Sequence, residues 1–256
     1  MQKNGFNQNT DPAELEKFNR FAEEWWSPKG RFRPVHAFNA VRLKKIQDWI
    51  GSRLEAPPEN SKPFAGIDLI DVGCGGGLIS EPLARQGARV VGVDASKRNI
   101  EVAQWHAEKS QVRIDYRHGV IEEAVSQTER FDVVLSLEVL EHVPDPKVLL
   151  DACSELLKPN GILIIATLDR TWRSYLLAIL GAEYVLRWLP KGTHRWSKFI
   201  RPAEIKNALP KGQFTLNEVR GVSFNPLKNR WRISRDTSVN YMMLFQKSVS
   251  ADHVDQ

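Results

Sequence analysis

Short apolar runs recur along most of the chain, separated by segments whose apolar residues have helical spacing. Such runs are typical of strands that helices cover on both faces. The predicted strands lie near residues 67–72, 89–94, 112–117, 131–136 and 161–167, with a later pair near 214–222 and 239–246. This alternation predicts an α/β fold with a Rossmann-like, doubly wound, mostly parallel sheet of seven strands.

Two amphipathic helices are predicted before the first strand, over residues 13–26 and about 36–54. A proline-rich stretch at 57–63 follows them as a linker. We predict that residues 1–62 form a helical lid and linker, and that residues 63–256 form the main domain. A lid over the ligand would exclude water from a reaction that water could spoil.

The turn after the first predicted strand is rich in glycine. Residues 67–77 read Ile-Asp-Leu-Ile-Asp-Val-Gly-Cys-Gly-Gly-Gly, and the next apolar run ends at Asp94. This order of strand, turn, helix and strand is typical of a nucleotide held against bare backbone. The spacing differs from the dinucleotide fingerprint, because Leu78 stands where that fingerprint requires its third glycine.

Acidic residues beside this turn indicate a cationic ligand. Asp71 precedes the first glycine by two residues, where it would repel a phosphate and attract a cation. S-adenosylmethionine carries an ammonium and a sulfonium and no phosphate, so we predict this ligand; a plain helix-capping turn is the alternative. Asp94 would accept hydrogen bonds from the ribose hydroxyls. The cofactor-binding residues predicted from this motif are Asp71, Gly73, Gly75, Gly77 and Asp94.

A second candidate cluster follows the fourth predicted strand. If the stretch turns helically, Glu138, Glu141 and His142 share one face at the carboxyl end of that strand. They could bind a divalent cation such as Mg²⁺ or Zn²⁺, which would lower the pKa of a phenol. Without a metal, His142 and Glu141 are the candidate bases for a phenolic proton, or the cluster is structural. His194 is a further candidate for contact with a substrate hydroxyl.

Charge and hydropathy set the end of the chain apart. The 256 residues carry a formal net charge of +5, yet residues 165–256 hold 15 Lys and Arg against 7 Asp and Glu. An apolar segment interrupted by charges lies at 172–190 in this basic region. We predict an apolar helical insertion at about 170–200 that contacts a membrane surface or the substrate, with a core helix as the alternative. No recognised nucleic-acid module accompanies the basic residues, so we expect no nucleic-acid partner.

The cysteines and the lack of targeting signals indicate the cellular compartment. Cys74 and Cys153 are far apart in the sequence, which indicates a reducing environment. The first residues lack the apolar core of a signal peptide, and no apolar run is long enough to span a bilayer.

Together these motifs resemble the ubiquinone-biosynthesis O-methyltransferases, a family of class I methyltransferases. The resemblance covers nearly the whole chain and rests on the segments Trp25–Trp26, Asn39–Arg42, Asp71–Gly77, Glu138–Pro146, Gly181–Tyr184, Pro190–His194 and Asn240–Tyr241. The glycine motif is shared by many methyltransferases, whereas the Pro-Lys-Gly-Thr-His and Glu-His-Val-Pro-Asp-Pro pieces are far more specific. The resemblance implies methylation of ring hydroxyls on polyprenylated catechol and demethylubiquinol intermediates, at both O-methylation steps of the pathway.

The resemblance also implies residue roles and partners. Cofactor contacts are implied at Arg42, Gly73, Asp94 and Leu137, with Arg42 on the methionine carboxylate, and the Glu-x-x-Glu-His pattern implies dependence on a divalent cation. The implied partners are a polyprenylated phenol or quinol, anionic membrane lipids and other ubiquinone-biosynthesis proteins. We expect a cytoplasmic protein bound peripherally to the inner membrane surface. A carbon methyltransferase of a quinone ring and a non-catalytic membrane-bound scaffold of the same fold are the alternatives.

Overall fold

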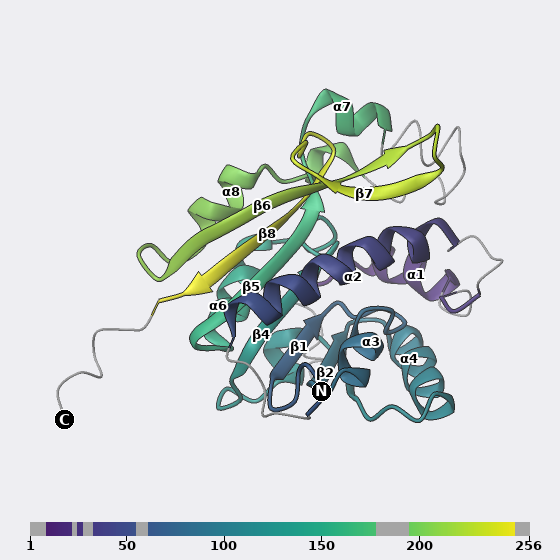
Figure 1. Ribbon diagram of the computed structural model, residues 1–256, viewed down its shortest axis with the longest axis vertical. Helices are drawn as coiled ribbons and strands as arrows, with labels where there is room; N and C mark the ends of the chain where they lie inside the picture. The colour runs from purple at the N-terminus through teal and green to yellow at the C-terminus, as the bar shows by residue number, and fades with distance from the viewer. Residues whose placement is uncertain (1–8, 22–24, 28–32, 55–60, 178–194, 249–256) are drawn as a thin grey trace, which may run out of the picture.

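A mixed β-sheet runs through the structure, a computed structural model that describes residues 9–21, 25–27, 33–54, 61–177 and 195–248. The strands span Asp68–Val72 (β1), Arg89–Asp94 (β2), Asp115–His118 (β3), Phe131–Leu137 (β4), Leu157–Leu168 (β5), Phe214–Asn225 (β6), Arg230–Ser234 (β7) and Asn240–Lys247 (β8). Their order in the sheet is β3-β2-β1-β4-β5-β8-β6-β7 (Figure 1).

The strand directions follow a doubly wound plan. Strands β1 to β5 are parallel, β8 lies antiparallel between β5 and β6, and β7 folds back on β6. The predicted α/β, mostly parallel architecture is therefore confirmed. The described residues form eight strands instead of the predicted seven, because β7 reads Arg-Trp-Arg-Ile-Ser and has no apolar run to reveal it.

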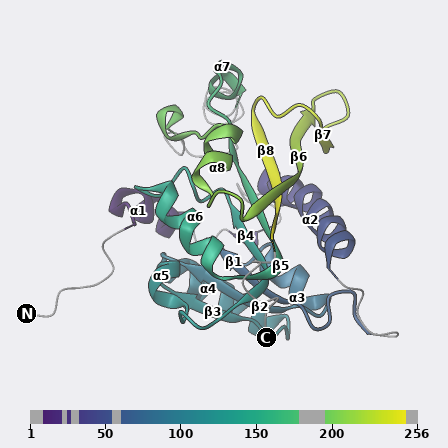
Figure 2. The same ribbon diagram turned by 90° about the vertical axis from the view of Figure 1, so that its left-hand side faces the viewer.

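Helices cover both faces of the sheet (Figure 2). They span Pro12–Phe21 (α1), Arg33–Arg53 (α2), Ser80–Arg85 (α3), Lys97–Lys109 (α4), Ile121–Ala124 (α5), Pro146–Glu155 (α6), Trp172–Ser174 (α7) and Pro202–Ala208 (α8). Helices α2 and α3 share a core with one face of the sheet, and α5, α6 and α8 share a core with the other. The carboxyl ends of the parallel strands are left free to form a site.

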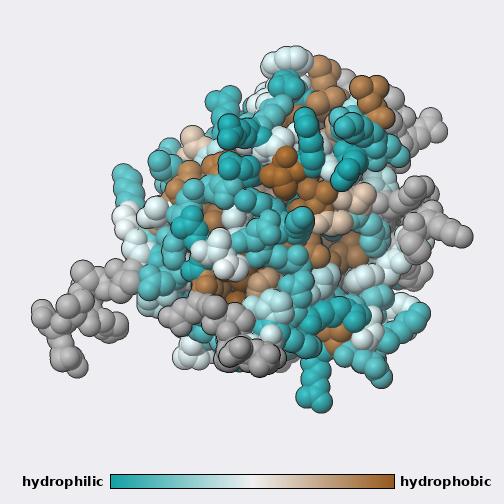
Figure 3. Space-filling view, viewed as in Figure 1, coloured by the Kyte–Doolittle hydropathy of each residue, from teal (hydrophilic) through white to brown (hydrophobic). Residues whose placement is uncertain are grey.

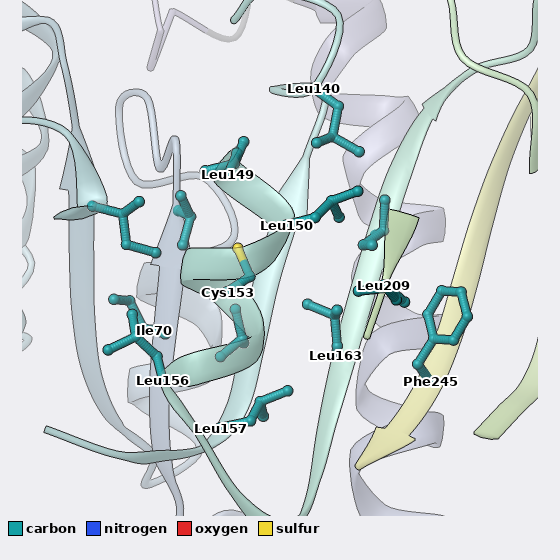
Figure 4. Packing of buried hydrophobic residues seen from close by; sticks show 14 of the residues in the cluster. Ile70, Leu140, Leu149, Leu150, Cys153, Leu156, Leu157, Leu163, Leu209 and Phe245 are labelled. Atoms are coloured by element: carbon teal, nitrogen blue, oxygen red, sulfur yellow. The ribbon is translucent and has the colours of Figure 1, made fainter. Parts of the chain in front are cut away.

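Strand β5 shows how one apolar run contributes to both cores. Residues 162–165 are all 0% exposed. Leu163 and Ile165 join the core on the α6 side, whereas Ile162 and Ile164 join the core on the α2 side. Successive side chains of a strand point to opposite faces, so this run requires helices on both sides. Figure 4 shows the α6 side, where the helix lies against the strands.

Helix α2 belongs to the core of the sheet. Ile46, Trp49 and Ile50 are at most 2% exposed, and Trp49 Nε1 donates to Glu218 Oε2 of β6 at 2.5 Å. The predicted boundary at residue 62 therefore does not separate α2 from this core. For α1 and Trp25–Trp26, which are not among the residues of this core, the lid stays a prediction.

The predicted insertion at about 170–200 is described only in part. Helix α7 begins it, and residues 178–194, including His194, lie outside the described residues. Among the residues that the structure describes, no helix combines the length and apolar character needed to cross a bilayer. Cys74 and Cys153 are buried free thiols.

Candidate active site

The glycine-rich turn after β1 exposes its backbone to a ligand. Gly73 and Gly75 have φ angles of 73° and 55°, which glycine adopts without strain. A Cβ added at Gly73 would stand 2.3 Å from a methyl carbon of Val139. The amides of Gly73 and Cys74 donate to the Val93 carbonyl at 2.8 and 3.0 Å. The turn therefore needs glycine both for its conformation and for its closeness to the neighbouring chain.

A cavity of about 910 Å³ opens beside this turn, in the size range of a small-molecule site. The predicted cofactor residues that line it are Arg42, Asp71, Gly73, Gly75, Asp94 and Leu137. Gly77, also predicted to bind the cofactor, is not part of the lining. A Cβ at Gly77 would stand 2.2 Å from the Tyr116 hydroxyl, so this glycine makes room for β3.

Asp94, at the end of β2, is held by three hydrogen bonds. The Gly75 amide donates to Oδ2 at 2.8 Å, and the Ser96 amide and the Asn99 side chain donate to Oδ1 at 2.8 and 3.2 Å. Burial raises the pKa of Asp94, and these donors oppose that rise. Because a carboxylate has about four acceptor positions, Asp94 keeps capacity for a ligand hydroxyl.

Asp71 places a buried negative charge next to the turn. Its side chain is 3% exposed and accepts a hydrogen bond from the Ser80 hydroxyl at 2.5 Å. Burial raises the pKa of Asp71 to about 6, so the carboxylate is mostly ionised at neutral pH. A buried carboxylate is stabilised by a nearby cation, which is the charge expected of the methyl donor.

Arg42 enters the cavity wall from α2. Nη1 donates to Glu138 Oε1 at 2.7 Å, Nη2 donates to the Asn39 side chain, and the guanidinium lies 4.3 Å from the centroid of the Phe38 ring. Its Nε is buried without a hydrogen-bond partner. The guanidinium is thus already paired with one carboxylate. The contact with a methionine carboxylate that the resemblance implies stays a prediction.

The residues of the predicted metal site are directed to different partners. Glu138 has a φ of 57°, and the chain after β4 forms a turn instead of the helix that would gather these side chains on one face. Glu138 pairs with Arg42, whereas His142 Nδ1 lies 2.9 Å from a carboxylate oxygen of Glu14 in α1. In the described part of the chain, no group of three or more His, Cys, Asp or Glu side chains is placed to hold a metal ion. This geometry therefore does not support the ligand set Glu138, Glu141 and His142.

Glu141 lies behind the cavity wall and is not among the lining residues. It is 3% exposed, its Oε2 accepts a hydrogen bond from the Thr167 hydroxyl at 2.7 Å, and its Oε1 is buried without a partner. Burial, together with the negative charge of Glu138, raises the pKa of Glu141 well above its ordinary value. A carboxyl group that does not line the cavity is poorly placed to take a proton from a ligand. His142, which does line the cavity, is left as the candidate base.

Two tryptophans cover the glycine-rich turn. Trp25 Nε1 donates to the Asn99 side chain at 3.0 Å, and Trp26 Nε1 donates to the Gly76 carbonyl at 2.7 Å. Trp26 also stacks on His106, with ring centroids 3.4 Å apart and planes within 2°. These contacts place Trp25 and Trp26 over the glycine-rich turn, and a lid function of this segment stays a prediction.

The cavity continues into an apolar part that the sequence analysis did not assign. Phe38 of α2, Phe224 of β6 and Trp231 of β7 line it. The Trp231 ring lies 5.0 Å from that of Phe38 and 5.1 Å from that of Phe224, between centroids. The strand pattern placed these residues on separate elements, so no local signal could show that they meet. This aromatic cluster can hold a flat, greasy molecule next to the predicted donor.

Comparison with known proteins identifies the family. Residues 42–219 match the family model described as Methyltransferase domain. The ubiquinone biosynthesis O-methyltransferases of Chelativorans sp. (strain BNC1) and Brucella anthropi are 50% and 51% identical to this chain over 237 residues; these cover 93% of the chain and 94% and 96% of those proteins. The chain belongs to the ubiquinone biosynthesis O-methyltransferase family.

Solved structures agree on the fold of this ubiquinone biosynthesis O-methyltransferase family member. Magnesium protoporphyrin IX methyltransferase from Synechocystis PCC 6803, with bound SAH, gives a TM-score of 0.64 at 18% identity and covers 90% of this chain and 94% of its own. The plantazolicin methyltransferase BpumL, in complex with SAH, gives 0.62 at 16% identity and covers 93% and 97%. The predicted class I methyltransferase fold is confirmed. Membership in this methyltransferase family supports the predicted cofactor, S-adenosylmethionine.

Proposed function

We propose that this chain transfers a methyl group from S-adenosylmethionine to ring hydroxyls of polyprenylated catechol and demethylubiquinol intermediates, at both O-methylation steps of ubiquinone biosynthesis. The observation that carries the proposal is the continuity of one cavity. The acids at the glycine-rich turn, His142 and the aromatic cluster of Phe38, Phe224 and Trp231 all line it. Such a cavity accommodates a cationic donor and an aromatic acceptor side by side.

Residues at the glycine-rich turn and residues of the aromatic cluster have different roles in the reaction. When bound, S-adenosylmethionine supplies a methyl group on a sulfonium that is already activated for transfer. Asp71 and Asp94 hold the charged and ribose parts of the donor, and Phe38 and Trp231 orient the acceptor ring so that its hydroxyl is aligned for attack. His142 takes the hydroxyl proton during the transfer.

Methyl transfer from labelled S-adenosylmethionine to a short-chain prenylated catechol tests the proposal. We expect a product with the methyl group on oxygen, located by mass spectrometry, and the assay is run with and without added Mg²⁺ or Zn²⁺. A methyl group on carbon would instead indicate a carbon methyltransferase. Tight donor binding without any product would indicate a non-catalytic scaffold.

Asp94→Asn is the matching test of the donor site. Replacing an ionised acceptor removes hydrogen bonds worth about 1.5–3 kcal/mol each, so we expect donor affinity to fall by at least about tenfold in calorimetry. Asp48→Asn, at an exposed position of α2, is the control and leaves affinity unchanged. Wild-type affinity in Asp94→Asn would contradict the donor site.

A membrane contact completes the proposal. Trp172, Tyr175, Leu176 and Leu177, here called the 172–177 patch, are 70, 44, 43 and 56% exposed. Figure 3 shows apolar side chains reaching the surface at the α7 end of the molecule. Arg173 and Leu177 also line the cavity, so the patch lies at its mouth. Aromatic and apolar side chains beside a cation suit an anionic lipid surface, from which a prenylated substrate can enter.

A further inference from the structure

We propose that Glu14 of α1 is the positioning residue that orients His142 as the base, an inference that rests on the proposed function. Glu14 Oε2 lies 2.9 Å from His142 Nδ1. Glu14 is 5% exposed, and His142 lines the cavity. A carboxylate at this distance accepts the Nδ1 proton, which leaves the lone pair of the ring on Nε2. A base needs that lone pair to receive a proton from the acceptor hydroxyl.

Helix α1 does not need Glu14 to reach its place. The Asn9 side chain donates to the Asp145 carbonyl at 3.1 Å and accepts from the Asp145 amide at 2.9 Å. Asp11 pairs with Lys198 at 3.5 Å. The Asn9 contacts hold the start of α1 against the loop that carries His142, and the Asp11 pair holds it against the 3₁₀ helix Trp196–Lys198. Glu14 therefore buries a carboxylate beside an imidazole where the helix is already anchored by other residues.

Burial of a carboxylate costs free energy, because the charged group loses its hydration. A desolvated carboxylate is unfavourable unless it is paired through good hydrogen bonds, and the cost of burying such a pair often exceeds its attraction. The same arrangement is useful when the imidazole must gain a proton during a reaction. A buried carboxylate on the far nitrogen fixes the tautomer and the ring plane and stabilises the protonated ring, as in histidine–carboxylate pairs of other enzymes.

The pairing also couples the base to the lid. Helix α1 and Trp25–Trp26 belong to the same N-terminal segment, and Trp26 contacts the Gly76 carbonyl of the cofactor turn. The segment that covers the turn therefore also supplies the carboxylate that pairs with His142.

Glu14→Gln in the full-length chain tests the positioning role. We expect kcat for catechol methylation to fall by about ten- to a hundredfold, part of the factor of about 10²–10⁴ that a base supplies, with donor affinity and the KM for catechol unchanged. Glu14→Asp should restore part of the loss. Glu16→Gln, at an exposed position of the same helix, is the matched control and should retain wild-type kcat.

A double-mutant cycle separates positioning from a merely structural role. If Glu14 acts through His142, Glu14→Gln causes no further loss of kcat in a His142→Gln background. Additive losses, or a fall in donor affinity as large as the fall in kcat, would overturn the proposal.

The tautomer of His142 is read without any turnover. We expect ¹⁵N NMR of the wild-type protein, with the signal assigned by its absence in His142→Gln, to show the proton on Nδ1, and this preference to be lost in Glu14→Gln. A proton on Nε2 in the wild type overturns the positioning role whatever the activity. An Nδ1 proton in a protein that methylates no catechol instead removes the proposed function, and with it the base that Glu14 would serve.

Discussion

At the scale of single residues, burial shifts the pKa values of two acids in and beside the site. Burial raises the pKa of Asp71 to about 6, and raises that of Glu141 well above its ordinary value. At neutral pH Asp71 is therefore mostly ionised next to the turn. Asp71 lines the cavity and Glu141 does not, so their surroundings suit them to different uses. A charge next to the turn attracts a cationic donor.

Donor affinity should depend on pH through Asp71. If the donor's cation requires the ionised carboxylate, affinity should be about tenfold weaker at pH 5 than at pH 7, because Asp71 is protonated below about 6. Calorimetric titrations across this range measure the effect. Asp71→Asn should bind more weakly at pH 7 and lose most of this pH dependence; an unchanged slope in the variant would assign the effect to other groups.

Stability of the ligand-free protein should move in the opposite direction. The pKa of Asp71 is raised on folding from 3.8 to about 6, so its protonation stabilises the folded state fully below pH 3.8, and this contribution is lost as pH rises through about 6. Binding and stability thus respond to the same proton with opposite sign.

At the scale of elements, the local sequence pattern predicted most strands. It did not predict which side chains of those elements line the cavity or join the core. The apolar runs of β1, β2, β4 and β5 identified buried strands because each is read from consecutive residues. The charged β7 lacked that signal, although its Trp231 lines the cavity. Helix α2 was expected in a lid, and its buried face instead completes the core of the sheet.

The β6–β7 hairpin should select the acceptor. Trp231→Ala removes an aromatic wall of the cavity, so we expect the KM for a prenylated catechol to rise by about tenfold while donor affinity is unchanged. Steady-state kinetics, with the donor and the acceptor concentrations varied separately, measure the two effects. Trp105→Ala, at an exposed position of α4, is the control. Equal losses toward donor and acceptor would place Trp231 in the framework of the fold.

At the scale of the whole molecule, the cavity mouth and the exposed apolar residues lie together. The 172–177 patch and Trp196 are near one another, because Trp196 Nε1 donates to the Thr171 carbonyl at 2.8 Å, next to α7. Basic residues predominate in this part of the sequence. A protein that contacts a bilayer with this face would bind a hydrophobic substrate directly from the membrane, without exposing it to water.

Vesicle binding tests this orientation. Trp172→Asp combined with Leu176→Asp places negative charge on the patch, and we expect co-sedimentation with vesicles rich in phosphatidylglycerol to weaken by about tenfold or more. Trp105→Asp makes the same kind of substitution at an exposed position of α4, outside the patch, and should bind vesicles as the wild type does. Calorimetry with S-adenosylmethionine checks that the cofactor site is intact. Undiminished binding by the double variant would place the membrane contact elsewhere.

The sequence by itself determined the positions of the strands in the first half, the glycine-rich turn and the acids at the ends of β1 and β2. Each of these is a local feature, because a strand, a turn and the residue that follows them are contiguous. The structure does not support the predicted metal site, because the spacing of Glu138 and His142 gathers their side chains only in a helix, and the chain forms a turn there.

Tertiary structure alone decided which residues surround the chemistry. Glu14 meets His142 across 128 positions, Arg42 meets Glu138 across 96, and Phe38 meets Trp231 from another element. No periodicity records such contacts, because they depend on how helices and strands pack after they form. The sequence can therefore indicate which ligand the glycine-rich turn binds, whereas the packing of distant elements decides which side chains line the rest of the cavity.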